Sequence, residues 1–153
     1  MTRVIALVFV LLASVAANAA PAPTGLWLTQ DREGVIAISP CGGNFCAHIV
    51  GVVLDHPDDK MPVDHRGVSQ CDLPLITDAS QVQPNLWTGH ITDPGSGDHY
   101  DVELHLNPHG TLALRGFLGI PLLGRTQTWT RYTGRVPADC RLLAYAGRIQ
   151  ADR

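Results

Sequence analysis

Histidine side chains are the groups in this sequence with the most obvious potential for catalysis. An imidazole base beside a serine or threonine can activate the hydroxyl as a nucleophile. His90 and His99 flank one turn, so a hairpin could bring them together as an acid–base or metal-binding pair. None of the histidines lies in a nucleophile elbow or another known catalytic motif. The histidines considered are His48, His90, His99, His105 and His109. We therefore predict no enzyme and keep a metal-dependent or histidine-based hydrolase as a third hypothesis.

Acidic side chains could also bind a metal ion. They gather in the polar stretch 55–72, where the possible ligands are Asp55, His56, Asp58, Asp59, Asp64 and His65. Their spacing matches neither a calcium loop nor a His-x-x-x-His site. The turn 93–98, with Asp93, Ser96 and Asp98, consists of ordinary turn-forming residues, with calcium as the alternative. We predict a solvated loop, no metal site and no cofactor.

The N-terminal segment has the features of a secretory signal peptide. Arg3 precedes an apolar run over residues 4–16, which is too short for a stable transmembrane helix. The run closes with Ala17-Asn18-Ala19, whose small residues suit a signal peptidase. We expect cleavage after Ala19, an extended N-terminus over 20–24 and a mature protein that does not span the membrane.

Export changes the interpretation of the cysteines, because an oxidising compartment favours disulfides. Cys41 and Cys46 enclose a turn-type sequence and could face each other across a hairpin, which would leave Cys71 to pair with Cys140. Three pairings are possible, so the sequence does not fix the connectivity. A zinc site would need two CxxC-like pairs, which the chain lacks.

Composition narrows the class of protein. The chain of 153 residues has a formal net charge of −3, with no basic stripe of the kind that nucleic-acid binders use. We therefore expect no nucleic-acid partner. Its length supports one domain, and glycine, proline and threonine at short intervals favour strands over long helices.

Short strand-like runs follow one another from residue 25 to residue 132. The clearest covers 100–107, where Val102, Leu104 and Leu106 alternate with polar residues, as in a strand with one buried face. The other runs cover 26–29, 35–39, 45–54, 73–76, 87–92, 112–114 and 126–132, with a polar connector after 76. They predict an all-β domain over 25–132, a single antiparallel β-barrel or strongly curled sheet of about eight strands. The C-terminal extension 133–153 contains a loosely helical pattern over 138–150, which indicates a short helix or a frayed tail.

Two segments are more specific than their composition, namely 87–100 (WTGHITDPGSGDHY) and 114–131 (LRGFLGIPLLGRTQTWTR). With the sequences 25–27 (GLW) and 41–46 (CGGNFC), they resemble the uncharacterised exported bacterial family known as domain of unknown function 2147. The resemblance covers about residues 25–131 and implies export in a bacterium, to the periplasm, but no established activity or catalytic residues. The sequence differs from the usual pattern at Pro121 and in the extension that carries Cys140.

A second resemblance is to lipocalin-like barrels. These place a Gly-x-Trp on the first strand and an arginine on the last, with the guanidinium stacked on the indole to close one end. Gly25, Trp27 and Arg131 occupy those positions. Gln127, Trp129 and Arg131 alternate along the last strand and share one face, which indicates core packing first and ligand contact second.

The apolar segment 117–124 is the other candidate for binding. Burial in the core is favoured, but an apolar loop at a barrel rim could bind a lipid, a hydrophobic ligand or a protein. Arg115 and Arg125 flank it and would suit an anionic head group. The candidate ligand-binding residues are Trp87, Tyr100, Arg115, Phe117, Arg125, Gln127 and Trp129.

These observations predict a non-enzymatic protein of the bacterial envelope, periplasmic or secreted, that binds a small apolar or amphipathic molecule. This prediction rests on fold analogy. The alternative is an accessory module that docks on another envelope protein through residues 117–123. A roomy barrel interior favours the first function, and a filled core with an exposed loop favours the second.

Overall fold

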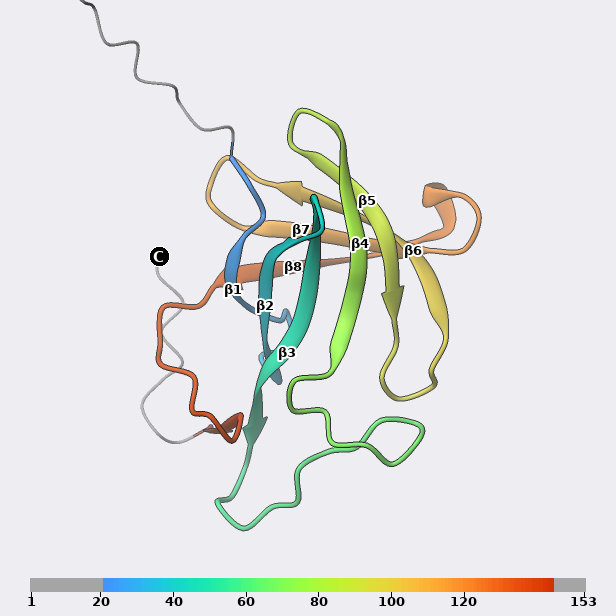
Figure 1. The fold of residues 1–153 in the computed structure, drawn as a ribbon. Coiled ribbons are helices and arrows are strands. Elements are labelled where there is room, and N and C mark those ends of the chain that lie inside the picture. The colour runs from blue at the N-terminus through green and yellow to red at the C-terminus, as the bar shows by residue number, and fades with distance from the viewer. Residues whose placement is uncertain (1–20, 145–153) are drawn as a thin grey trace, which may run out of the picture.

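A computed structural model describes residues 21–144, which form nine β-strands and one short 3₁₀ helix (Figure 1). The strands are β1 (Gly25–Leu28), β2 (Gly34–Cys41), β3 (Asn44–Leu54), β4 (Pro74–Gln83), β5 (Leu86–Thr92), β6 (His99–Leu106), β7 (Leu112–Phe117), β8 (Arg125–Arg131) and β9 (Arg141–Leu143). The helix η1 spans Pro121–Leu123. The predicted signal peptide lies outside the described residues. Within the described part of the chain, no helix has the length and apolar character needed to span a membrane.

The strands β1 to β8 form a closed antiparallel barrel. Each pairs with the next in sequence, and β1 pairs with β8 through Trp27 opposite Arg131. The connections β1–β2, β3–β4, β5–β6 and β7–β8 therefore lie at one end, which we call the open end. The remaining connections lie at the other, which we call the closed end. Closure leaves no unpaired edge among these strands, and it confirms the predicted fold class.

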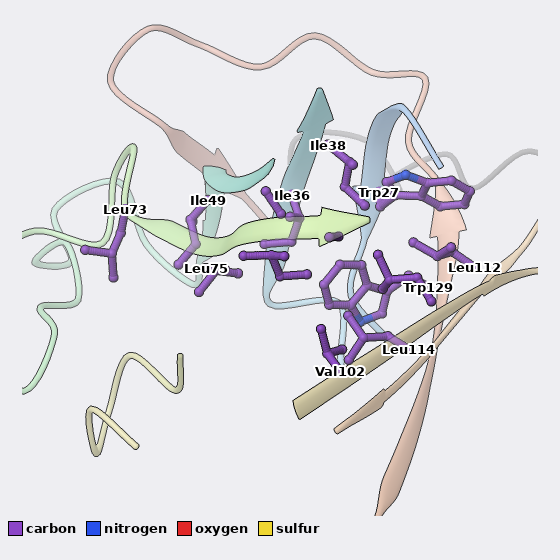
Figure 2. Packing of buried hydrophobic residues seen from close by; sticks show 14 of the residues in the cluster. Trp27, Ile36, Ile38, Ile49, Leu73, Leu75, Val102, Leu112, Leu114 and Trp129 are labelled. Atoms are coloured by element: carbon purple, nitrogen blue, oxygen red, sulfur yellow. The ribbon is translucent and has the colours of Figure 1, made fainter. Parts of the chain in front are cut away.

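The barrel core follows from the alternation of side chains along each strand. In β6, Val102 and Leu104 point inward and are fully buried, whereas Asp101 and Glu103 lie on the outer face. Figure 2 shows that β1, β7 and β8 contribute large side chains to the same interior. The labelled members are Trp27, Ile36, Ile38, Ile49, Leu73, Leu75, Val102, Leu112, Leu114 and Trp129.

Strand β4 is longer than the sequence predicts. The expected polar connector after residue 76 is strand up to Gln83, and only Pro84 and Asn85 separate β4 from β5. Two register shifts interrupt the pairing of β4 with β5, between Ile76 and Ser80 and between Gln81 and Gln83. Because each shift breaks the two-residue period, the alternation that identifies a strand is lost in the sequence.

The predicted C-terminal helix is absent from residues 138–144, and residues 145–150 lie outside the described residues. Residues 141–143 instead form β9, parallel to the end of β3 from Val52 to Leu54. This part of β3 is available because β4 pairs with β3 only between Phe45 and His48. Val52 donates to the Cys140 carbonyl at 2.7 Å, so the extension completes the hydrogen bonding of β3.

The extension also packs against the outside of the barrel wall near Gly51 and Val35. Leu28 and Val35 are fully buried although the barrel core does not include them. Leu142 lies against Gly51, where a Cβ would come within 2.7 Å of the Leu142 methyl group and 3.1 Å of the Val35 Cβ. The absence of a side chain at Gly51 thus allows β9 to approach the wall.

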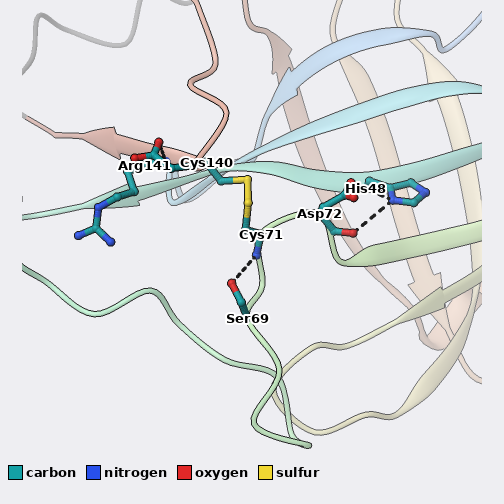
Figure 3. The surroundings of a disulfide bond; sticks show 7 residues. His48, Ser69, Cys71, Asp72, Cys140 and Arg141 are labelled. Atoms are coloured by element: carbon teal, nitrogen blue, oxygen red, sulfur yellow. Dashed lines mark hydrogen bonds and ion pairs between the residues drawn. A yellow bond between two sulfur atoms is a disulfide. The ribbon is translucent and has the colours of Figure 1, made fainter.

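Two disulfides connect the cysteines. Cys41 and Cys46 bridge the β2–β3 hairpin at the closed end, and Cys71 joins Cys140 (Figure 3). The second bond links the long β3–β4 connection to the start of β9. It therefore fixes both segments against the same side of β3.

The long β3–β4 connection is organised around Asp64, whose side chain is 2% exposed. Its carboxylate accepts hydrogen bonds from the backbone of Arg66 and Val68, each at 2.9 Å, and from the Arg66 guanidinium at 2.8 and 2.7 Å. Burial opposes ionisation, but these bonds prevail and lower the pKa of Asp64 to about 2. The connection contacts the β5–β6 turn through His65, which donates to the Pro94 carbonyl.

Candidate functional site

A cavity of about 460 Å³ opens at the open end of the barrel. Its lining combines apolar inward side chains of the strands with polar side chains, among them Thr29, Gln70 and Thr92. The apolar lining residues are Ile36, Ile49, Val52, Leu75, Ile91 and Leu114. This volume is typical of small-ligand sites, which are pockets of about 300–1,000 Å³.

The polar atoms of this lining include those of Tyr100, Gln127 and Trp129, and strand pairing explains the position of these three side chains. Leu114 lies opposite Gln127 and Ile91 opposite Tyr100, so these residues share the inner face. Trp129 follows two residues after Gln127 on the same face. The Trp129 indole donates to the Gln127 side-chain carbonyl at 2.9 Å, which leaves the Gln127 amide nitrogen and the Tyr100 hydroxyl as possible ligand partners.

The rim of the cavity is acidic. Asp31 and Glu33 come from the β1–β2 turn, and Asp93 comes from the β5–β6 turn. Asp31 accepts a hydrogen bond from the Glu33 backbone, and Asp93 accepts from Gly95 and Ser96, so two of the carboxylates also stabilise their turns. The field at the entrance favours neutral or cationic groups over anionic ones.

The closed end is sealed by Trp27 and Arg131. Trp27 is fully buried and donates to the Pro23 carbonyl at 2.8 Å. The Arg131 guanidinium lies 3.9 Å from the centroid of the Trp27 ring and donates to the Thr24 carbonyl, and burial lowers its pKa. Gly25 has φ of 121°, and a Cβ there would collide with the Arg131 guanidinium. The three residues thus have the arrangement expected from the sequence.

Four of the candidate ligand-binding residues lie away from the cavity. Trp87 is buried in the core, edge-on to Phe45 with ring centroids 6.2 Å apart. Arg115 and Phe117 alternate with the inward Leu114 and lie on the outer face of β7. Arg125 is exposed at the start of β8 and does not line the cavity. The arginines therefore provide no anionic head-group site within it.

The apolar segment 117–124 is not buried in the core, contrary to the favoured interpretation of the sequence. The exposed fractions are 67% for Leu118, 53% for Ile120, 82% for Leu122 and 77% for Leu123. The strand pairing of β7 ends at Phe117 and that of β8 begins at Arg125, so the intervening residues leave the wall as a loop. The loop lies beyond the paired part of the wall, so these side chains lie outside the barrel.

The histidines are not combined into one catalytic or metal site. His90 contacts Asp78 at 2.6 Å and Asp101 at 3.7 Å on the outer wall, whereas His99 contacts the Thr92 hydroxyl at 2.9 Å. His48 lies 3.5 Å from Asp72 (Figure 3). Among the described residues, no three histidine, cysteine or acidic side chains are close enough to hold a metal ion.

Comparison with known families places this fold among bacterial proteins. Residues 25–131 match the family model described as "Uncharacterized protein conserved in bacteria (DUF2147)". The chain belongs to the DUF2147 family. The matched segment covers the barrel from the start of β1 to the end of β8, so the extension with β9 lies outside it. No curated protein matches the chain.

This DUF2147 protein is also similar to a solved structure from Helicobacter pylori, protein HP1028, which is described as belonging to the lipocalin family. The two share 21% sequence identity with a TM-score of 0.60, over 71% of this chain and 81% of the other. At this identity the likeness shows the fold, and the lipocalin-like barrel that the sequence predicts is confirmed.

The sequence indicates only part of this cavity. Tyr100, Gln127 and Trp129 were candidates, but the acidic rim was not expected. Asp31 and Glu33 are distant in sequence from Asp93, and only barrel closure brings the two turns to one entrance. The sequence feature that could have predicted the acidic rim is the presence of acidic residues in the β1–β2 and β5–β6 turns, because these turns lie at the same end of an up-and-down barrel.

Proposed function

We propose that this protein binds a small apolar or amphipathic molecule in the cavity at the open end of the barrel. The observation that supports this proposal most directly is the cavity of about 460 Å³, which six aliphatic side chains line together with polar ones, in a barrel whose far end Trp27 and Arg131 close. Apolar walls with a few polar groups are the usual form of such a site. Tyr100, Gln127 and Trp129 are the residues we assign to ligand contact.

The polar part of the ligand lies at the entrance and is neutral or positively charged. The support is the rim of Asp31, Glu33 and Asp93, together with the exclusion of Arg115 and Arg125 from the lining. An anionic head group would have to approach three carboxylates, and the described residues that line the cavity include no lysine or arginine.

We assign this function to the bacterial envelope, in the periplasm or outside the cell. The support is the signal-like segment 1–19, the two disulfides and membership of a family conserved in bacteria. After cleavage the mature protein begins at Ala20.

A neutral fluorescent probe, N-phenyl-1-naphthylamine, tests the cavity directly. The mature protein should enhance and blue-shift the probe's emission on binding. Ile91→Trp places a larger side chain in the lining and should weaken probe binding by about tenfold, equivalent to about 1.4 kcal/mol. Val82→Trp, at an exposed position of β4 away from the cavity, is the matched control and should bind as the wild type does.

Native mass spectrometry of protein purified without detergent from its own periplasm then names the ligand class. A co-purifying apolar or amphipathic molecule supports the proposal. Equal probe binding by the Ile91→Trp and wild-type proteins, with both folded by circular dichroism, would show that the cavity is not the binding site.

A further inference from the structure

We propose that the β7–β8 loop, residues 118–124, inserts its apolar side chains into the surface of a lipid bilayer. Among the described residues, seven large hydrophobic side chains are exposed, and four of them, Leu118, Ile120, Leu122 and Leu123, belong to this loop. Such a concentration in one short segment is unusual for a surface that faces only water. The loop lies at the end of the barrel that also holds the cavity.

Part of the loop backbone is hydrogen-bonded within the loop itself. Ile120 donates to the Leu118 carbonyl, Leu123 donates to the Ile120 carbonyl, and Gly124 donates to the Pro121 carbonyl. Pro121 has no N–H to satisfy. Backbone groups without partners are costly in lipid, where water cannot replace the missing bond.

Arg115 also donates to two loop carbonyls, that of Leu122 and that of Pro121, which accepts from Gly124 as well. Its guanidinium donates to Pro121 at 2.6 Å and to Leu122 at 3.2 Å, and it also donates to the Thr126 hydroxyl at 2.7 Å. Arg115, on strand β7, thus holds the loop in its protruding conformation. A protein-binding loop could leave such carbonyls for its partner, whereas a loop that enters lipid must satisfy them internally.

The loop sequence and the arginine that follows it also suit a membrane surface. No charged residue occurs between Leu118 and Gly124, and Arg125 follows directly, where an exposed guanidinium can contact lipid phosphate. Asp101 and Glu103 lie behind the loop on the outer wall of β6. The apolar side chains of the loop would therefore enter the bilayer first, and the charged groups would remain at the membrane–water interface.

The expected binding is weak and reversible. The four side chains carry about as many apolar carbons as one myristoyl chain, which gives a partition constant of about 10⁴ M⁻¹ when fully inserted. The loop therefore provides temporary contact with a bilayer and not a permanent anchor.

The test is flotation of the mature protein with vesicles of phosphatidylethanolamine and phosphatidylglycerol. We expect the wild type to float with the vesicles and Leu122→Asp/Leu123→Asp to lose binding by at least about tenfold. Val82→Asp is the matched control, because it replaces an exposed apolar side chain near the closed end of the barrel, away from the loop. It should bind vesicles as the wild type does. Ile91→Trp, which blocks the cavity, should also keep vesicle binding, so failure of the proposed ligand site is distinguishable from failure of this inference.

A fluorescent variant measures insertion itself. The three native tryptophans are 0–3% exposed, whereas Leu122 is 82% exposed, so Leu122→Trp adds one indole in contact with water. Vesicles should shift its emission to the blue, and lipids with a quencher on the acyl chain should quench it.

Two results would overturn the inference. The first is a wild type that does not float, or that floats as well as Leu122→Asp/Leu123→Asp. The second is a dimer in sedimentation velocity that the double variant abolishes while vesicles leave the Leu122→Trp emission unchanged. That result would assign the loop to contact between protein chains.

Discussion

Arg131 joins three parts of the closed end, because its guanidinium stacks on Trp27 and donates to the Thr24 carbonyl beside Gly25. We predict that Arg131→Ala lowers the free energy of unfolding by about 2 kcal/mol, from the lost cation–π contact and the unpaired carbonyl. Trp27→Ala should cost about 3–5 kcal/mol, as for other large buried aromatic residues. Urea unfolding measures both, with Arg125→Ala as the exposed control. Unchanged stability in both variants would remove the closure argument.

His90 gives the outer wall a pH dependence. Its hydrogen bond to Asp78 and the charge of that carboxylate raise the pKa of His90, with a further contribution from Asp101. Burial opposes the ionisation of Asp78, but the hydrogen bonds and charge of His90 lower its pKa. A raised folded-state pKa stabilises the protein below the ordinary histidine value of 6.5, and a lowered one stabilises it above the ordinary aspartate value of 3.8.

We therefore predict that the pair contributes most between those two pH values, and that this contribution is lost as the pH rises through the raised pKa of His90. Thermal unfolding across the pH range measures it. His90→Gln should remove this component of the pH dependence, and His109→Gln, in the β6–β7 turn, should retain it. Superimposable profiles for the wild type and His90→Gln would contradict the prediction.

Single residues were predictable where a local rule applies to them. Trp27 and Arg131 follow from their positions on the first and last strands. The outward direction of Arg115 follows from its alternation with the inward Leu114. Arg115 flanks the apolar segment in sequence, but this does not place its guanidinium in the cavity. The partners of Arg115 depend on how the loop returns over its own strand, which no spacing rule specifies.

At the scale of elements, the two disulfides differ in the length of chain that they close. The Cys71–Cys140 bond spans 69 residues and the Cys41–Cys46 bond spans 5. We predict that Cys71→Ser/Cys140→Ser lowers the free energy of unfolding by about 4 kcal/mol and Cys41→Ser/Cys46→Ser by about 2 kcal/mol, from loop-closure entropy. Urea unfolding of each double variant under the same non-reducing conditions gives the comparison. A larger loss for the short loop would show that local geometry outweighs chain entropy.

The sequence predicts a strand best where alternation and neighbouring turns mark it locally. β6 has an uninterrupted alternation and sits between two hairpin turns, so it was recognised. β4 lost that alternation at its register shifts. The sequence predicts a short helix or a frayed tail where β9 lies, because its partner β3 is far away in sequence and the parallel pairing leaves no turn signal.

The whole molecule has two unlike ends. One is sealed by Trp27, Arg131 and the disulfide between Cys41 and Cys46, and the other carries the cavity, the acidic rim and the apolar loop. A bilayer-bound loop would hold the entrance near the membrane, where an amphipathic ligand would be available. The two proposals therefore describe one geometry, although each has its own test.

We predict that the acidic rim makes the proposed ligand site prefer cationic over anionic amphiphiles. Decyltrimethylammonium and decanoate have similar apolar chains and opposite charges. We predict that the cation binds about tenfold more tightly at low ionic strength, because of the carboxylates at the entrance, and that high salt reduces this ratio. Isothermal titration calorimetry below the micellar range measures both. Glu33→Gln, at the rim, should reduce the ratio, whereas Glu103→Gln, on the outer wall, should leave it unchanged. A preference for decanoate would show that the head group does not lie at this rim.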